Sequence, residues 1–164
     1  MRALMKSTVL LMFPGFVLGI LAQACGGTGP AHAQAAETPD PIEGVWTAEV
    51  TIRDCTTGAT VRSFRGLQMF EHGGQLTATN NAPTATQGPS LGGWQKGATA
   101  GQYTSTFRFF RYAVDGTFAG SQRVSRTIQL SGDKFTSTIS AQVLDPGDQV
   151  VQTVCGTEVS SRSP

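Results

Sequence analysis

Side chains that could carry acid–base, nucleophilic or metal chemistry are few in this chain, and they are scattered. His72 is the only histidine after His32, and it stands beside two glycines in a predicted turn. A lone histidine in a turn, with no partner placed by its neighbours, is typical of a structural or solvated residue. The sequence contains no nucleophile elbow, metalloprotease motif, zinc-binding cysteine pair or phosphate loop. It therefore predicts no catalytic residue, no metal site and no cofactor.

The acidic residues have a simpler explanation than catalysis. Asp115, Asp133, Asp145 and Asp148 fall in predicted turns, where a carboxylate accepts hydrogen bonds from nearby backbone amides. Two acids around Pro146-Gly147 are too few for calcium, which takes about six to eight oxygen ligands. We therefore expect these carboxylates to stabilise turns.

Residues suited to binding lie on a long predicted hairpin, residues 103–130. Two runs rich in aromatic, β-branched and hydroxyl side chains flank Asp115-Gly116, a dipeptide that favours a two-residue turn. Pairing across that turn sets Ala113 opposite Phe118 and gathers the larger apolar side chains on one face, which we expect to point inward. The other inward-facing pairs are Phe109 with Gln122, Phe107 with Val124, and Tyr103 with Ile128.

One pair in this register is unfavourable. It opposes Arg108 and Arg123, two like charges. A β-bulge at Phe109-Phe110 would separate them, so the register near the turn is the least determined part of the hairpin.

Arg126 is the most informative residue on the inward face. Together with Gln122 it lies among aromatic and aliphatic side chains, where an unpaired charge is costly. Its partner is a ligand carboxylate or phosphate, or an internal acid such as Glu158; a wet position near the mouth is the third explanation. Trp94, in a glycine-rich stretch beside the predicted loop over residues 81–89, is a further candidate to face a ligand. The predicted ligand-binding residues are Arg126, Gln122, Phe107, Phe109, Trp94 and Tyr103.

Residues 1–35 have the features of an export signal. Arg2 and Lys6 precede an apolar run over residues 9–22 that is too short to span a bilayer, and small residues follow. We expect cleavage after Ala35 and a secreted or periplasmic protein.

The alternative is a lipid anchor on Cys25, whose preceding residues half match a lipobox. After the signal, residues 36–42 are expected to form a flexible lead and residues 43–164 the folded domain. Loss of two basic residues with the signal leaves ten against 11 acidic ones, a net charge of −1. No positive excess remains to bind nucleic acid, and no further stretch is long enough for a transmembrane helix.

The folded domain breaks into eight strand-length runs separated by turn residues, with no amphipathic helix. Besides the two strands of the hairpin, the predicted strands cover residues 43–54, 60–71, 75–80, 91–96, 134–144 and 149–159. Such spacing is typical of an antiparallel sandwich or barrel. Cys55 ends the first strand and Cys155 lies in the last, and a disulfide between them joins strands that are neighbours only if the sheet closes. The sequence therefore predicts an all-β, up-and-down antiparallel barrel of about eight strands, with room for packed side chains or one small ligand.

The two ends of the domain resemble the lipocalins and the wider calycin group. Gly44-Val45-Trp46 is similar to the Gly-x-Trp opening of that family, and Arg162 stands where the family has an arginine that packs across the tryptophan. The resemblance implies a barrel whose closed end is covered by Trp46 and Arg162. The chain is also similar to small exported bacterial proteins of unassigned function, which implies no activity.

Three functions fit these features. We expect a non-enzymatic binding protein for a small, partly apolar or amphipathic molecule. The alternative is a structural or interaction module of the cell envelope, with a filled barrel and an outer face, including Phe110 and Tyr112, that binds a partner. The third is a cofactor-free isomerase or cyclase, which would need His72 or an acid beside another titratable group in a cleft. These functions differ in whether the interior holds a cavity and in what lines it.

Overall fold

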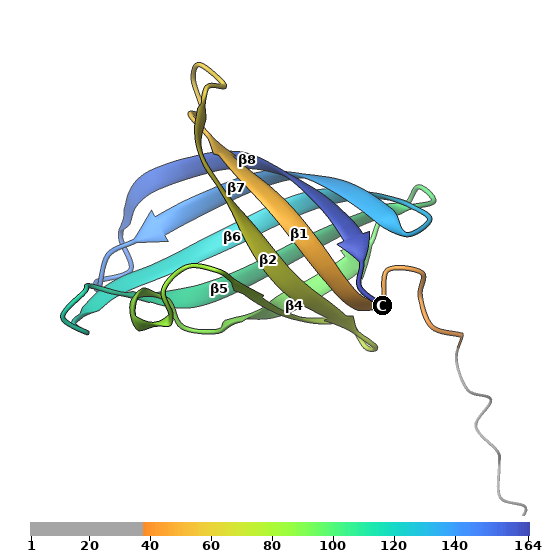
Figure 1. Cartoon of the computed structure of the whole chain (residues 1–164), viewed down its shortest axis with the longest axis horizontal. Helices are drawn as coiled ribbons and strands as arrows, with labels where there is room; N and C mark the ends of the chain where they lie inside the picture. The colour runs from red at the N-terminus through yellow and green to blue at the C-terminus, as the bar shows by residue number, and fades with distance from the viewer. Residues whose placement is uncertain (1–37) are drawn as a thin grey trace, which may run out of the picture. The chain divides into compact units, whose positions relative to one another are not determined.

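The computed structural model describes residues 38–164, which form one closed β-barrel (Figure 1). The eight strands are β1 (Gly44–Arg53), β2 (Thr60–Glu71), β3 (Gln75–Asn80), β4 (Ser90–Lys96), β5 (Gln102–Tyr112), β6 (Phe118–Ser131), β7 (Lys134–Leu144) and β8 (Val150–Arg162). A turn of 3-10 helix, Thr84–Thr86, is the one helical element among these residues. None of the helical structure in this part of the chain is long and apolar enough to cross a membrane. The predicted export signal, with Cys25 and Ala35, lies outside the described residues.

Each strand pairs in antiparallel fashion with the next, and β8 returns to pair with β1. This confirms the predicted all-β, up-and-down barrel. The turns after β2, β4 and β6 lie at one end of the barrel together with the start of β1 and the end of β8, and we call this the closed end. The connections after β1, β3, β5 and β7 lie at the other end, which we call the open end.

The strand β7 illustrates why these residues form a barrel. Exposed Thr, Ser and Gln side chains alternate along it with buried residues, from Phe135 to Val143. A period of two places one set of side chains inside the barrel and the other outside. The predicted bounds of β1 to β4 and of β7 agree with the observed ones to within one residue. The strand β8 extends to Arg162, beyond the predicted end at residue 159, because its last residues pair with both β1 and β7.

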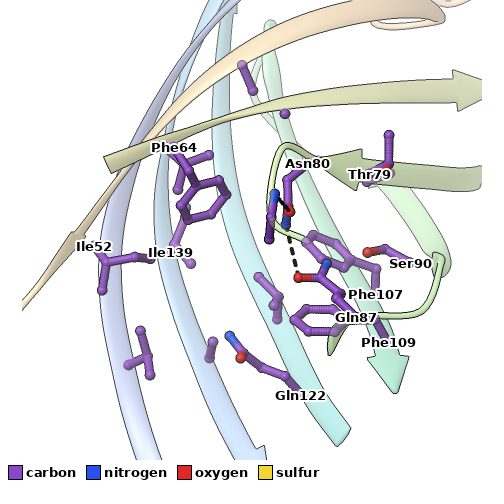
Figure 2. A pocket seen from close by; sticks show the side chains of 18 of the residues that line it. Ile52, Phe64, Thr79, Asn80, Gln87, Ser90, Phe107, Phe109, Gln122 and Ile139 are labelled. Carbon is purple, nitrogen blue, oxygen red and sulfur yellow. Dashed lines mark hydrogen bonds between the residues drawn. The ribbon is translucent and has the colours of Figure 1, made fainter. Parts of the chain in front are cut away.

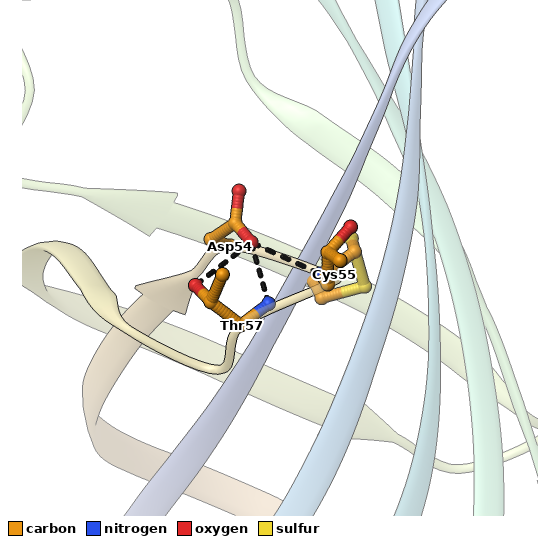
Figure 3. Close-up of a disulfide and its surroundings, with 5 residues drawn as sticks. Asp54, Cys55 and Thr57 are labelled. Atoms are coloured by element: carbon orange, nitrogen blue, oxygen red, sulfur yellow. Dashed lines mark hydrogen bonds between the residues drawn. A yellow bond between two sulfur atoms is a disulfide. The ribbon is translucent and has the colours of Figure 1, made fainter.

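A disulfide joins Cys55 to Cys155 near the open end, as predicted (Figure 3). Cys55 follows β1 by two residues, and Cys155 pairs with Arg53, the last residue of β1. The two Cα atoms are 5.2 Å apart, within the range that a disulfide spans. The Oδ1 atom of Asp54 holds the turn by accepting hydrogen bonds from the amide and the hydroxyl of Thr57. The cross-link ties the first strand to the last where the barrel opens.

The central hairpin departs from the prediction at its tip. The strand β5 ends at Tyr112, which pairs with Phe118 in place of Ala113, and residues 113–117 form a longer connection than the predicted two-residue turn. The predicted pairs further from the tip are present, namely Phe109 with Gln122, Phe107 with Val124, and Tyr103 with Ile128. Between its pairs with Phe110 and Tyr112, β6 contains one residue more than β5. This bulge lies in β6, and not at Phe109-Phe110 as predicted.

Gly120 makes the bulge possible. Its φ is 96°, and a Cβ atom there would lie 2.1 Å from the carbonyl oxygen of Leu144, so only glycine fits. The extra residue reverses the facing of side chains beyond it. Phe118 therefore points outward, 44% exposed, where we had predicted an inward position. Outside the barrel it packs against Phe110 and Tyr112, with ring centroids 5.8 and 6.2 Å away.

The predicted like-charge pair is present, and the bulge does not relieve it. Arg108 lies opposite Arg123. The side chain of Arg108 donates to the hydroxyl of Ser121 at 3.0 Å and forms an ion pair with Asp148, in the turn between β7 and β8. The carboxylate of Asp148 therefore compensates the charge that the opposed arginines bring together.

Aromatic and aliphatic side chains fill the closed end. The buried cluster consists of Ile42, Trp46, Phe70, Leu76, Trp94, Tyr103, Ile128 and Phe135. Trp46 and Phe135 have ring centroids 4.9 Å apart. Ile42 belongs to the segment predicted to be a flexible lead, yet it is fully buried, and its carbonyl accepts a hydrogen bond from Trp46 Nε1 at 2.8 Å. Ile42 therefore plugs the closed end of the barrel.

Arg162 covers Trp46 at this closed end. The guanidinium carbon lies 4.4 Å from the ring centroid, and Nη1 and Nη2 donate to the carbonyls of Glu43 and Pro41 at 2.8 and 2.6 Å. Gly44 has a φ of 120°, and a Cβ atom on it would lie 2.8 Å from Arg162 Nη1. Within the Gly-x-Trp sequence, Gly44 thus leaves room for the Arg162 guanidinium, and Trp46 provides the ring on which it packs.

Candidate functional site

A cavity of about 760 Å³ occupies the open half of the barrel (Figure 2). This volume lies within the range of small-molecule sites, about 300–1,000 Å³. Buried side chains of β1, β6 and β7 form its apolar wall, namely Ala48, Val50, Val124, Ile139 and Ala141. Larger, partly buried side chains extend this wall, among them Phe64, Phe107 and Phe109. Four of the five buried wall residues are Ala or Val, so they leave space that aromatic side chains fill at the closed end.

The connection between β3 and β4, residues 81–89, borders the cavity at the open end. Asn80 Nδ2 donates to Gln87 Oε1 at 3.2 Å, which links the two ends of this connection (Figure 2). Gln87 also pairs with Arg111 of β5 through an isolated β-bridge. Gln122 and Gln152 add polar groups to the cavity lining. The lining of the cavity therefore combines polar groups with apolar walls.

Arg126 and Glu158 form a buried ion pair that also lines the cavity. Arg126 Nη1 lies 3.0 Å from Glu158 Oε2, and the two residues expose 5% and 2% of their surface. They face each other because β6 and β8 flank β7 and both residues occupy inward positions. Of the three explanations for Arg126 on the inward face, this geometry supports the internal partner Glu158.

Each oxygen of Glu158 accepts two hydrogen bonds. Oε1 accepts from Gln68 Nε2 and from the Ser160 hydroxyl at 2.8 Å. Oε2 accepts from Arg126 Nη1 and from the Ser137 hydroxyl at 2.8 Å. A carboxylate offers about four acceptor positions, so no position remains for a substrate proton.

Arg126 is satisfied less completely than its partner. Nε donates to the Ser105 hydroxyl at 2.8 Å, and Nη1 donates to Gln68 and Glu158. Nη2 is buried and has no hydrogen-bond partner within residues 38–164. The guanidinium carbon lies 5.0 Å from the ring centroid of Phe107. Burial lowers the pKa of Arg126, whereas the charge and hydrogen bond of Glu158 oppose this shift, and arginine remains protonated in such sites.

The structure brings together four of the predicted ligand-binding residues and separates two. Those that border the cavity are Arg126, Gln122, Phe107 and Phe109. Trp94 lies in the closed-end cluster, where its Nε1 donates to the Glu71 carbonyl at 3.0 Å. The strand β4 runs from the open end of the barrel to the closed end. Trp94 therefore lies away from the loop over residues 81–89, beside which we expected it. Tyr103 lies in the same cluster, and its hydroxyl donates to Asp40 Oδ1 at 2.5 Å.

Four polar residues that surround the ion pair were not among the residues predicted from the sequence. Gln68, Ser105, Ser137 and Ser160 are all buried at inward strand positions. A polar residue in the inward phase of an alternating strand, such as Ser137 between Phe135 and Ile139, is a detectable signal. The strand pattern alone does not show that four strands place such residues around one ion pair.

The remaining candidate groups lie elsewhere. His72 is in the closed-end turn between β2 and β3, with Nδ1 3.2 Å from Glu43 Oε1. In the part of the chain that the structure describes, no group of three or more His, Cys, Asp and Glu side chains could hold a metal ion.

No known protein-family model matches the chain, and no curated protein or solved structure is significantly similar to it. The closed eight-stranded barrel is consistent with the lipocalin-like fold expected from the sequence, and it does not by itself show a family. Because one fold hosts many functions, the function has to be inferred from the site itself.

Proposed function

We propose that this protein binds a small, partly apolar molecule inside the barrel and does no chemistry on it. The observation that carries the proposal is the cavity of about 760 Å³, with its apolar walls and the polar groups of its lining. A ligand there would exchange contact with water for contact with side chains such as Val124 and Phe109, which favours binding by the hydrophobic effect. The packed closed end beneath the cavity supports these walls.

Two other functions have weaker support. An interaction module of the cell envelope would use the outward cluster of Phe110, Tyr112 and Phe118, in which Phe110 is 52% exposed. An interaction module would not need the small inward residues that leave the cavity open, and we therefore favour the binding function. A cofactor-free isomerase or cyclase would need an acid beside another titratable group in a cleft, and Glu158 beside Arg126 meets that requirement. Both oxygens of Glu158 already accept two hydrogen bonds each, however, so this acid offers no free base to a substrate.

We further propose that the protein acts outside the cytoplasm. The disulfide between Cys55 and Cys155 supports this, because such bonds persist in oxidising compartments. The export signal predicted for residues 1–35 is in keeping with that location.

Titration with N-phenyl-1-naphthylamine, a neutral fluorophore that brightens in apolar surroundings, tests the proposal. We expect saturable binding that is lost in Ala141→Phe, because Ala141 is buried in the cavity wall. The matched control is Ser140→Phe, which adds the same ring to the outer face of the same strand. Equal binding by both variants and the parent would place the fluorophore outside the barrel and contradict the proposal.

A further inference from the structure

We propose that the cavity selects neutral ligands that carry a hydrogen-bond acceptor, such as a ketone or ester oxygen, and discriminates against carboxylates. This inference rests on the proposed binding function and names the chemical class of the ligand. Arg126 Nη2, the buried nitrogen without a partner, is the group that would hold the acceptor.

The donors of Arg126 are incompletely used. A guanidinium carries five N–H groups, and the two on Nη2 have no acceptor in the described part of the chain. A buried donor without an acceptor is costly, so an oxygen that reaches Nη2 gains more than it would from an exposed donor. The site therefore favours ligands with an acceptor over plain hydrocarbons.

The charge at this position is already neutralised. Glu158 lies 3.0 Å from Arg126, and both are almost fully buried. A ligand carboxylate on Nη2 would bring a second negative charge close to Glu158, with no second cation bonded to the pair among residues 38–164, and burying that charge is costly. A neutral oxygen accepts the same hydrogen bonds without adding charge. A ligand ammonium would find no acceptor position left on Glu158.

Phe107 contacts both the cavity and the guanidinium of Arg126. Its ring packs on the guanidinium at 5.0 Å and also borders the cavity. Nη2 is enclosed in the structure, so an acceptor reaches it only after a side chain between it and the cavity shifts, and we infer that Phe107 is that side chain. The apolar part of the ligand then lies against Val124 and Ile139.

Two probes of equal chain length, 2-undecanone and undecanoate, test this selectivity by displacement of N-phenyl-1-naphthylamine at pH 8. We expect the ketone to bind at least about tenfold more tightly, because undecanoate has to be buried as a second negative charge beside Glu158. In Glu158→Gln the Arg126 charge is no longer neutralised, so undecanoate should gain at least about tenfold. The control Glu49→Gln makes the same change in net charge on an exposed side chain and should leave both affinities unchanged.

The outcomes separate this inference from the function on which it rests. Tighter binding of undecanoate by the parent protein, or no gain in Glu158→Gln, overturns the selectivity and leaves the binding function intact. Failure of the fluorophore and both probes to bind contradicts the binding function itself. The infrared carbonyl stretch of bound 2-undecanone needs no variant: a frequency below that in hexane is expected, and the hexane frequency would overturn the assignment of Nη2.

Discussion

Arg126 on β6 and Glu158 on β8 form an ion pair inside the barrel, with Nη1 and Oε2 3.0 Å apart. The pair borders the cavity in the open half of the barrel. The pair explains how a charged residue can lie among Phe70, Phe107 and Val124. It also divides the interior into a packed closed end and an open half with space for a ligand.

The ion pair should behave as a unit. Arg126→Met leaves Glu158 buried without its cation and should lower the free energy of unfolding by about 3–5 kcal/mol. The double variant Arg126→Met/Glu158→Leu, which removes both charges, should recover most of that loss. Urea unfolding followed by tryptophan fluorescence measures both.

The exposed ion pair between Arg65 and Glu49 is the control, at 2.8 Å but with side chains 68% and 61% exposed. Arg65→Met should cost less than about 1 kcal/mol, because water already screens that pair. If Arg126→Met/Glu158→Leu were as unstable as Arg126→Met, the two residues would not behave as a unit.

The disulfide should contribute strongly to stability. It joins Cys55 to Cys155 across 100 residues of sequence, and a loop of that length is worth about 4–5 kcal/mol in the chain-entropy model. The variant Cys55→Ser/Cys155→Ser should lose a large part of this in urea unfolding. Reduction of the parent protein should bring it to the stability of the variant, and an unchanged midpoint after verified reduction would count against a structural role.

Gly44 should be intolerant of a side chain because of Arg162. Gly44→Ala meets both the positive φ and the close approach to Arg162 Nη1, whereas Gly58→Ala meets a positive φ with nothing within 4 Å. Gly44→Ala should therefore be the more destabilising of the two in thermal unfolding. In an Arg162→Ala background the difference should shrink, and an unchanged difference would show that the guanidinium is not the obstacle.

The contact between Asp40 and Tyr103 predicts how stability depends on pH. Partial burial alone would raise the pKa of Asp40, but hydrogen bonds from Tyr103 and Lys96 outweigh it, and the pKa lies below the usual 3.8. The unfolded chain then binds a proton more readily than the folded one, so stability is lost as the pH falls below about 4. Burial first, and the Asp40 carboxylate second, raise the pKa of Tyr103. Its contribution is present below about pH 10 and is lost as the pH rises above that value.

Tyr103→Phe and Asp40→Asn separate the two effects. Tyr103→Phe should remove the loss at alkaline pH that this residue causes, and Asp40→Asn should flatten the acid side of the profile. Urea midpoints measured from pH 2 to pH 11 provide the comparison. A parent-like slope above pH 10 in Tyr103→Phe would rule out this tyrosine as the cause.

The fold was largely predictable because alternation along each strand and the positions of Cys55 and Cys155 both carry topological information. The alternation of side chains along a strand predicts which of them point inward wherever the period of two is unbroken, as in β7. It fails beyond Gly120, where one extra residue turns Phe118 outward. That bulge depends on the close approach of the Leu144 carbonyl, a contact between separate strands that local sequence does not reveal.

The site was predictable in part for the same reason. The alternation of side chains along each strand predicted that Arg126, Gln122, Phe107 and Phe109 point into the barrel. It did not predict how far along the barrel axis each residue lies. Trp94 was therefore expected near the mouth beside its neighbouring loop. The network around Glu158 depends on several strands whose relative heights are set by the closed sheet.

Native mass spectrometry of the protein, purified gently from its own cells or culture medium without reducing agent, most directly tests the claim that the barrel holds a small molecule. We expect a species heavier than the disulfide-bonded chain, whose extra mass is lost on denaturation and belongs to a neutral compound with at least one oxygen acceptor. A bare chain in repeated preparations, which also gains no mass when excess 2-undecanone is added, would contradict it.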